Sequence, residues 1–263
     1  MADDALLQVA RIAAGEFVMG ADDGEEDERP LHRAYIDDFA IGIYPVTNAE
    51  YAQFVRETGH PSPSIRALPL IVSGANEADF RAIAAAYFWN NGTPPEGRDR
   101  HPVTLVGYED ASAYCAWLAT RTRKPVRLPT EAEWERAARG GLEGKRFPWG
   151  DTLDAACAHF LPHATPKTER GTAPVGSYPP NNFDLHDMAG NVWEWVSDWY
   201  SPDYYERAQY INPQGPDGGL MRIVRGGAWV NSDGRYLRCA YRHEVPPDSY
   251  AYSIGFRVAY SLK

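Results

Sequence analysis

The C-terminal segment RIVRGGAWVNSDGRYLRCAYRHEVPPDSYAYSIGFRVA (222–259) carries the pattern that decides the fold. Three stretches in it and just beyond it, 222–230, 235–242 and 254–261, are expected to form short strands. Apolar and polar positions alternate in the last two stretches, as they do in half-buried antiparallel strands. The pair Gly226-Gly227 marks a tight turn. The segment therefore predicts a C-terminal part made of turns and short antiparallel strands.

Helical signals are confined to the chain before about residue 145. Thr47 and Thr130 each stand three residues before a glutamate, and this spacing is the capping box that opens a helix. The two helices are expected to end at the glycines Gly59 and Gly140. The other elements expected here are extended stretches over 13–20 and 33–46, a short helix near 76–86 and a helix over 110–122. Few helices and scattered antiparallel strands together predict a loop-rich α+β fold.

Composition limits the classes of function. The chain has 263 residues and a net charge of −10, with no cluster of lysines and arginines, so no nucleic-acid partner is expected. It contains no run of about 18 apolar residues, so no membrane partner or membrane span is expected. The start, MADDALLQVARIAAG, has acidic residues and no long apolar stretch, and it does not predict a signal peptide. Motifs spread from end to end predict a single domain over 1–263.

Four motifs carry a resemblance to a known family. They are LPTEAEWERAARGG (128–141), FPWGD (147–151), DLHDMAGNVWEW (184–195) and the C-terminal segment quoted above. In this order they resemble the formylglycine-generating enzyme, or sulfatase-modifying factor, family, and the resemblance extends from about residue 15 to residue 259. It implies the fold of that family, a variant of the C-type lectin fold.

The chain departs from this family at the reactive positions. The enzyme that names the family carries, in the last motif, a pair of cysteines that bind copper and oxidise a substrate cysteine. By motif position this pair would fall near Asn231 and Gly234, and the family's active-site serine corresponds to Ala228. Because none of the three is a thiol or a hydroxyl, neither the copper-thiolate reaction nor formylglycine formation on a sulfatase peptide is expected.

The three cysteines indicate a reducing compartment. In secreted animal members of the family, cysteines that match Cys115 and Cys239 each form a structural disulfide. The resemblance places their partners at Val258 and Ala138, so each bridge has lost one half. Disulfides contribute little in a reducing compartment, and a cytoplasmic location is therefore expected.

The motif over 184–195 is expected to hold structural calcium, which prefers carboxylate and carbonyl oxygens as ligands. The resemblance assigns four ligands, namely the side chains of Asp187 and Glu194 and the backbone carbonyls of Gly190 and Val192. The alternative is that Glu194 only bonds to nearby backbone within an aromatic core.

A second and weaker metal candidate is the loop that contains Cys157, His159 and His163. One sulfur and two imidazoles at short spacing can bind zinc, copper or iron. No fourth ligand is evident, and histidines in loops are commonly just solvated. The sequence therefore leaves any redox metal unidentified.

The last motif also predicts a ligand pocket, because this segment lines the substrate cleft in the family. Tyrosine and tryptophan supply large rigid contact surfaces, while Asn, Ser and Asp supply adaptable hydrogen bonds. The predicted pocket residues are Trp229, Asn231, Ser232, Asp233, Tyr236, Tyr241, His243, Tyr250, Tyr252 and Ser253. About half of them are expected to face the pocket and the rest to be core or ordinary surface. His243 is the candidate catalytic acid or base, because histidine is the residue in this set whose ordinary pKa is near neutrality.

Two functions of different class remain open. As an enzyme or maturation factor, the chain would promote the oxidative tailoring of a small molecule or peptide in the C-terminal cleft. The resemblance implies this for family members that lack the cysteine pair, which are linked to the chromophores of siderophores. The alternative is a non-catalytic protein that binds a small-molecule, peptide or protein ligand, such as a variable protein of a diversity-generating retroelement or an accessory sensing domain. A redox metal would favour the enzyme, and calcium alone would favour the binding protein.

Overall fold

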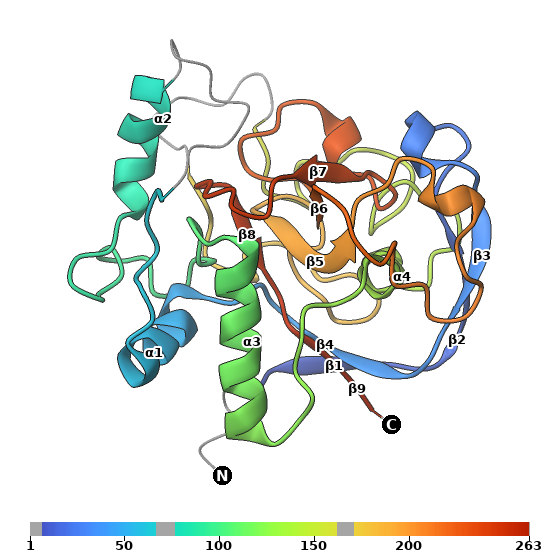
Figure 1. The fold of residues 1–263 in the computed structure, drawn as a ribbon. Helices are drawn as coiled ribbons and strands as arrows, with labels where there is room; N and C mark the ends of the chain where they lie inside the picture. Colours follow the sequence, from blue (N-terminus) through green and yellow to red (C-terminus); the bar gives the residue numbers. More distant parts are fainter. Residues whose placement is uncertain (1–6, 67–76, 162–170, 263) are drawn as a thin grey trace.

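The computed structural model describes residues 7–66, 77–161 and 171–262 (Figure 1). β1 (Val9–Ile12), β4 (Phe39–Gly42) and β9 (Ala259–Ser261) form an antiparallel sheet in the order β1-β4-β9. β2 (Gly15–Met19) pairs separately with β3 (His32–Ile36) in antiparallel register. The last strand of the chain therefore holds the N-terminal strands in place, and the described ends lie in one sheet.

A four-stranded sheet, which we call the central sheet, occupies the middle of the molecule in Figure 1. Its strands are β5 (Trp193–Trp199), β6 (Arg222–Arg225), β7 (His243–Val245) and β8 (Ile254–Phe256), in the order β7-β6-β5-β8. The pairings of β5 with β6 and of β6 with β7 are antiparallel, whereas β5 and β8 are parallel. This order places β7 at one edge of the sheet, and the segment that leads into β8 next to the start of β5.

The α-helices confirm the local signals in the sequence. They are α1 (Asn48–Thr58), α2 (Glu77–Ala84), α3 (Tyr108–Thr122) and α4 (Glu131–Arg139), and short 3-10 turns are η2 (Glu26–Glu28), η4 (Ala85–Tyr87), η6 (Tyr204–Glu206) and η7 (Gly234–Leu237). Thr47 caps α1 and Thr130 caps α4, each in a full capping box with the glutamate three residues on. Both helices end at a glycine with left-handed backbone, Gly59 and Gly140. The result is the α+β fold expected from the sequence, with few helices and short strands.

The prediction of a strand over 235–242 is wrong. This segment forms η7 and turns, and Asp233 caps η7 by accepting a hydrogen bond from the Arg235 N–H. The main-chain carbonyls that a neighbouring strand would use are taken by a side chain, because Arg225 donates to Cys239 O (2.6 Å) and Ala240 O (3.2 Å). The apolar alternation in this stretch therefore reflects packing around a buried arginine and not a ladder of strand hydrogen bonds.

The two neighbouring predictions hold in part. The stretch 222–230 is a strand only as far as Arg225, because Gly226 and Gly227 follow with φ values of 94° and 74° and turn the chain. The stretch 254–261 divides into β8 and β9, and these belong to different sheets. β8 also pairs parallel to β5, whereas the alternation suggested antiparallel pairing.

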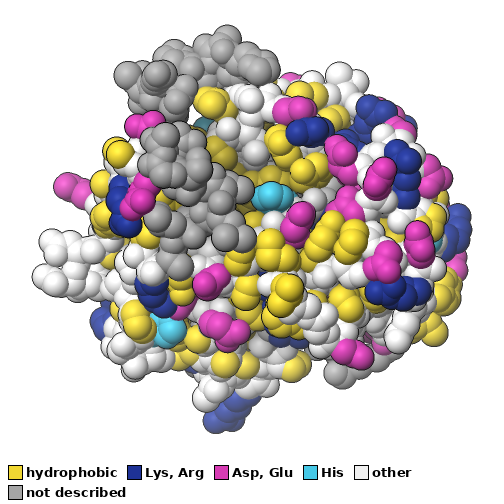
Figure 2. All heavy atoms as spheres, turned by 45° about the horizontal axis from the view of Figure 1, so that its top comes forward, with side chains coloured by type: hydrophobic (Ala, Val, Ile, Leu, Met, Phe, Trp, Pro, Cys, Tyr) yellow, Lys and Arg dark blue, Asp and Glu magenta, His cyan; other side chains and the backbone are white. Residues whose placement is uncertain are grey.

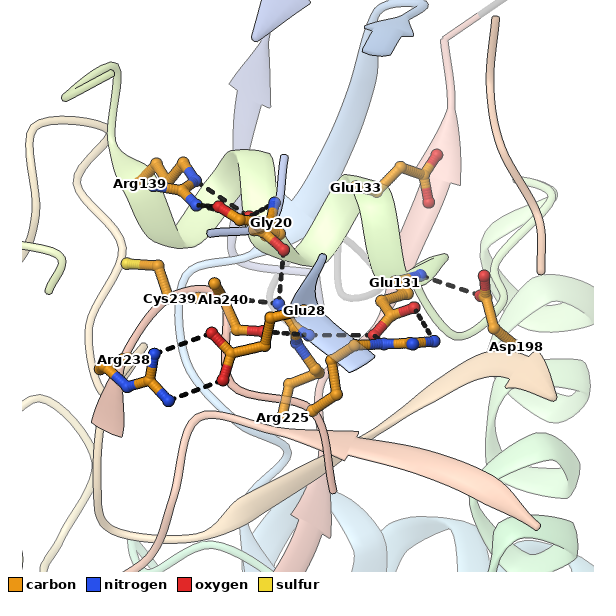
Figure 3. A network of polar contacts seen from close by, with 12 residues as sticks. Gly20, Glu28, Glu131, Glu133, Arg139, Asp198, Arg225, Arg238, Cys239 and Ala240 are labelled. Atoms are coloured by element: carbon orange, nitrogen blue, oxygen red, sulfur yellow. Dashed lines mark hydrogen bonds and ion pairs between the residues drawn. The ribbon is translucent and has the colours of Figure 1, made fainter. Parts of the chain in front are cut away.

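A buried network of ion pairs joins α4 to the central sheet (Figure 3). Arg225, fully buried on β6, donates to Glu131 (2.9 Å) and Glu135 (2.7 Å) on α4. Arg242 donates to both oxygens of Glu131 (2.8 and 3.0 Å), and Arg139 donates to Glu135 (2.7 Å). Burial alone would raise the pKa of Glu135, but the charges of Arg139 and Arg225 hold it below its usual value. The network fixes the backbone that enters β7, because Arg242 is the residue before His243.

The same network extends to two further carboxyl groups. Arg238 forms a bidentate ion pair with the buried Glu28 (2.6 and 2.8 Å), which ties the acidic loop after β2 to the segment that follows η7. Asp198 on β5 accepts a hydrogen bond from the Glu131 N–H (2.9 Å). Burial, and then the charge of Glu131, raise the pKa of Asp198 to about 7.

None of the helices in the described ranges is both long enough and apolar enough to cross a bilayer. The cysteines in these ranges are all free thiols. Cys115 and Val258 belong to one cluster of core residues, and Cys239 and Ala138 belong to another. The pairs of positions that the resemblance connects by disulfides thus share a core cluster here without being bridged.

Candidate functional site

A pocket with a cavity volume of about 460 Å³ lies beside the edge strand β7, and we call it the β7 pocket. Its apolar wall consists of Trp193, Met221, Val230, Tyr236, Val245, Pro246, Ala251 and Ile254, and its polar groups belong to Asn231, His243, Glu244, Ser249 and Ser253. Figure 2 brings the side of the molecule with β7 forward, and hydrophobic side chains there lie together with a histidine and acidic groups. The size and the mixture of apolar wall and few polar groups are those of a site for a small ligand.

The structure brings part of the predicted pocket together. Asn231, Tyr236, His243 and Ser253 line the β7 pocket. Tyr241 does not line it but packs behind it, with its ring 5.1 Å from that of Tyr236 and 5.9 Å from that of Trp193. These residues come from η7, the turns on either side of it, β7 and the approach to β8. The central sheet and the segment between β6 and β7 therefore position the site.

The other predicted pocket residues lie elsewhere. Trp229 is 4% exposed and packs with Tyr252, whose ring also lies 5.0 Å from Phe80 on α2, in a separate aromatic cluster. Tyr250 lies beneath the guanidinium of Arg66, 5.3 Å from its ring centre. Ser232 and Asp233 do not line the β7 pocket, and the Asp233 side chain serves as the cap of η7.

Sequence reasoning missed several residues of the β7 pocket. Trp193 is a buried residue of the main core cluster, and its ring also lies 5.0 Å from that of His243. Glu244, Pro246 and Ser249 lie within the segment 222–259, between residues that were predicted. Their position in this segment, together with the polar side chains of Glu244 and Ser249 and the rigid ring of Pro246, could have identified them. Met221 carries no signal in the sequence, because only the pairing of β6 with β7 brings it to this place.

His243 has the environment of a neutral base. It stands opposite Val224 in the β6–β7 register and packs against Trp193. Burial lowers the pKa of His243, and the charges of Glu244 and Asp27 oppose this shift only in part. The imidazole is therefore neutral at neutral pH and able to accept a proton from a bound molecule.

The family's reactive positions contain no redox side chain in this chain. Asn231 folds back so that its Oδ1 accepts a hydrogen bond from Ala228 N (2.7 Å). At Gly234 an added Cβ would lie 2.5 Å from Leu153 Cδ2, so the side chain of Leu153 occupies the space of a residue there. These contacts fill the places of both family cysteines with an amide and an aliphatic group.

The cysteines of the chain are not suited to act as reactive thiolates. Cys115 and Cys239 are buried, and burial raises the pKa of both, that of Cys239 to about 12. Cys157 is half-buried, and burial followed by the charge of Asp154 raises its pKa as well. No cysteine of the described residues lines the β7 pocket.

The calcium motif fits a hard cation only in part. Asp187 is buried, accepts one hydrogen bond from Gly176 N (2.8 Å), and burial raises its pKa. Glu194 already has a counter-ion, because Arg257 donates to both of its oxygens (2.6 and 2.7 Å). The Trp134 indole N–H donates a third bond to Glu194 (2.7 Å). Asp187 thus suits calcium, whereas Glu194 is committed to the guanidinium of Arg257.

The weaker metal candidate is not assembled in the described residues. His159 uses both ring nitrogens, with Nε2 2.7 Å from Gly171 O and Nδ1 3.2 Å from Tyr178 Oη. Cys157 lines a small cavity that His159 does not line. His163 lies outside the described residues. Within the described ranges no group of three or more His, Cys, Asp or Glu side chains is placed to hold a metal ion.

Comparison with known proteins supports the fold and the resemblance. The family model of the sulfatase-modifying factor enzyme 1-like domain matches residues 3–262. The formylglycine-generating enzyme of Streptomyces coelicolor is 41% identical over 282 residues, which cover 95% of this chain and 88% of that protein. The structure of PvdO from Pseudomonas aeruginosa has a TM-score of 0.76 at 30% identity, covering 97% of this chain and 94% of that one. Treponema denticola variable protein 1 has a TM-score of 0.74 at 23% identity, covering 96% and 94%, which is a likeness of fold alone.

Proposed function

This chain belongs to the family of the sulfatase-modifying factor enzyme 1-like domain, and we propose that it promotes the oxidation of a small molecule or peptide held in the β7 pocket. It is not proposed to be a formylglycine-generating oxidase. The observation that carries the proposal is the composition of this pocket, where Asn231, Tyr236 and His243 stand and no cysteine of the described residues does. The pocket includes residues of the segment that, by resemblance, lines the family's substrate cleft, and its lining chemistry differs from a cysteine pair.

The residues of the pocket support binding and proton transfer. Trp193 and Tyr236 offer aromatic faces to a flat or apolar part of the ligand, and their rings lie 6.2 Å apart. His243 is neutral at neutral pH and adjoins Trp193, so it can accept a proton from a hydroxyl or amine of the ligand during its oxidation. Dioxygen or another oxidant from solution would accept the electrons, since none of the pocket residues is a redox group. The mechanism proposed for this chain is thus orientation and deprotonation of the ligand.

Two measurements test this function together. We expect no aldehyde by mass spectrometry after incubation with a sulfatase peptide, because the thiol pair is missing. Elemental analysis of the purified, untagged protein then separates the two functions, because near-stoichiometric copper or iron would favour the enzyme and calcium alone would favour ligand binding. An aldehyde product, or a protein that carries neither redox metal and shows no oxygen uptake with any bound ligand, would contradict the proposal.

A second candidate function is the binding of a ligand without catalysis. It is favoured by the neutral hydrogen-bonding groups of Asn231, Ser249 and Ser253 around the rigid ring of Trp193, which suit recognition alone. His243→Asn distinguishes the two functions. In an enzyme this substitution should lower turnover at least tenfold with little change in ligand affinity, whereas in a binding protein there is no turnover to lose.

We further propose that the motif over 184–195 holds structural calcium. Asp187 and the carbonyls of Gly190 and Val192 would hold the ion, and Glu194 would contribute little because Arg257 already neutralises it. Calcium would place a further positive charge beside the Asp187 carboxylate, whose ionised form burial disfavours. The expected result is a higher Tm with added calcium than with a chelator, and no such difference for Asp187→Asn. An equal Tm under both conditions in the unsubstituted protein would contradict calcium binding.

A cytoplasmic or other reducing location is proposed from the cysteines. Each position that lost its disulfide partner still lies in the same core cluster as its former partner, Cys115 with Val258 and Cys239 with Ala138. Titration of thiols in the denatured protein, purified without reductant from its native host, should find three free groups for the three cysteines. A lower count would indicate a bridge and an oxidising compartment.

A further inference from the structure

The charge around the β7 pocket is one-sided. Two of its lining residues, His243 and Glu244, have side chains that carry a charge at or near neutral pH, and no lysine or arginine lines it. Burial lowers the pKa of His243, so that ring is neutral and Glu244 supplies the charge of the wall. In the described part of the chain, no side chain forms an ion pair with Glu244, which is exposed.

Two arginines beside the pocket are neutralised by carboxylates, whereas Arg222, opposite the lining residue Val245, forms cation–π contacts with Tyr108 and Trp199. Arg235 donates to the hydroxyl of Tyr236 (2.9 Å) at the rim, and it is paired with Glu25 (3.8 Å) and Asp233 (3.3 Å). Arg238 is paired with Glu28 (2.6 Å). The carboxylates around Arg235 and Arg238 therefore offset the positive charge of these two side chains, and the net charge of −10 adds a weak negative background.

We propose that the β7 pocket selects a cationic ligand, in which an aromatic or apolar body carries a protonated amine or a guanidinium that pairs with Glu244. The body of such a ligand contacts Trp193 and Tyr236, and its cationic group lies at the mouth of the pocket where the exposed carboxylate stands. An aromatic face and a carboxylate at one site attract the same cation, since the π face of a ring also favours positive charge. This inference rests on the proposed function and specifies its substrate class.

Three phenols with short side arms of different charge test the inference. Tyramine is cationic, tyrosol is neutral and 4-hydroxyphenylacetate is anionic at neutral pH. By isothermal titration calorimetry we expect tyramine to bind about three- to tenfold more tightly than tyrosol, and 4-hydroxyphenylacetate to bind more weakly than tyrosol. The preference should shrink as salt is raised, because the carboxylate is exposed to solvent.

Glu244→Gln keeps the shape of the side chain and removes its charge. We expect this variant to bind the three phenols with affinities within about twofold of one another. Glu96→Gln removes an equal charge from an exposed loop position outside the pocket and should keep the order of the unsubstituted protein. A preference for tyramine that survives in Glu244→Gln, or that is lost equally in Glu96→Gln, overturns the assignment to Glu244.

The failure of the inference and the failure of the proposed function give different results. Equal binding of the three phenols by the unsubstituted protein overturns the charge preference and leaves the β7 pocket as a binding site. Absence of binding by all three overturns the preference and also counts against an aromatic substrate in the proposed function. Tyrosol binding that persists in Glu244→Gln and weakens at least fivefold in Trp193→Ala places the phenol in the β7 pocket.

Discussion

Replacing Asp198 by asparagine should remove a pH dependence of stability that arises in the buried network. Asp198 is 2% exposed and accepts hydrogen bonds from the Glu131 N–H (2.9 Å) and the Ser197 hydroxyl (3.1 Å). Burial and the charge of Glu131 raise the pKa of Asp198 in the folded protein from 3.8 to about 7. In the unfolded chain the carboxyl returns to a pKa of about 3.9. Between these values the folded state therefore binds more protons than the unfolded state.

The sign and size of the effect follow from the two pKa values. A carboxyl whose pKa is raised by folding contributes stability fully below its unfolded pKa, and this contribution is lost as pH rises through the folded pKa. With values of about 3.9 and about 7, the contribution falls by roughly 1.4 kcal/mol between pH 6 and pH 8.5. In Asp198→Asn the amide oxygen can still accept the hydrogen bond from the Glu131 N–H. Because asparagine does not titrate, the pH-dependent contribution to stability is absent at every pH.

Urea unfolding at pH 6 and pH 8.5 measures this difference. The free energy of unfolding of the unsubstituted protein, minus that of Asp198→Asn, should fall by about 1.4 kcal/mol from the lower to the higher pH. Asp217→Asn, at an exposed position, controls for the loss of one negative charge and should give a smaller change. The pH-dependent contributions of the other carboxyl groups are the same in both proteins and cancel in the difference. A difference that stays constant with pH would refute the argument, since it would mean that Asp198 is ionised in the folded protein at pH 6.

Three further substitutions test other parts of the fold in the same urea assay. Gly190→Ala puts a Cβ 2.4 Å from His159 O at a φ of 81°, so it should lower the free energy of unfolding by about 3 kcal/mol or more. Thr130→Ala removes the hydroxyl that caps α4 and should cost about 1 kcal/mol, whereas Thr130→Ser should cost little. Arg225→Met removes one of the two buried arginine partners of Glu131 and of Glu135, leaving Arg242 and Arg139, and should cost about 3–5 kcal/mol. An effect below about 1 kcal/mol would contradict the structural role of this network.

The parts of the fold that depend on short-range chemistry could be predicted from the sequence. Thr47 and Thr130 mark their helices because the hydroxyl, the N3 amide and the N3 glutamate all lie within four residues. The prediction of a strand over 235–242 failed because Arg225 binds the backbone carbonyls of Cys239 and Ala240, which lie 14 and 15 residues further along the chain. Alternation of apolar residues cannot distinguish a strand from a turn that packs around a buried guanidinium.

The site could be predicted only where one segment of sequence supplies it. Asn231, Tyr236 and His243 fall within 222–259, and the structure places them in one pocket. Trp193 reaches the same pocket because β5 pairs parallel to β8 and brings Trp193 opposite Ile254. Parallel pairing across about sixty residues leaves no local signal, so the aromatic wall of the pocket required the structure.

The buried network offers a physical reason why the pocket keeps its shape where the resemblance implies disulfides and this chain has free cysteines. Cys239 shares a core cluster with Ala138 of α4, where the resemblance places one bridge. In this chain the same junction is held by charge, since Arg225 of β6 binds Glu131 and Glu135 of α4 and also the Cys239 carbonyl. Arg242 also binds Glu131, and it directly precedes His243 in the sequence. Ion pairs do not depend on an oxidising compartment. The chain of ion pairs reaches Arg242, the residue directly before the candidate base His243. α4 therefore holds the backbone beside His243 through the ion pair between Glu131 and Arg242.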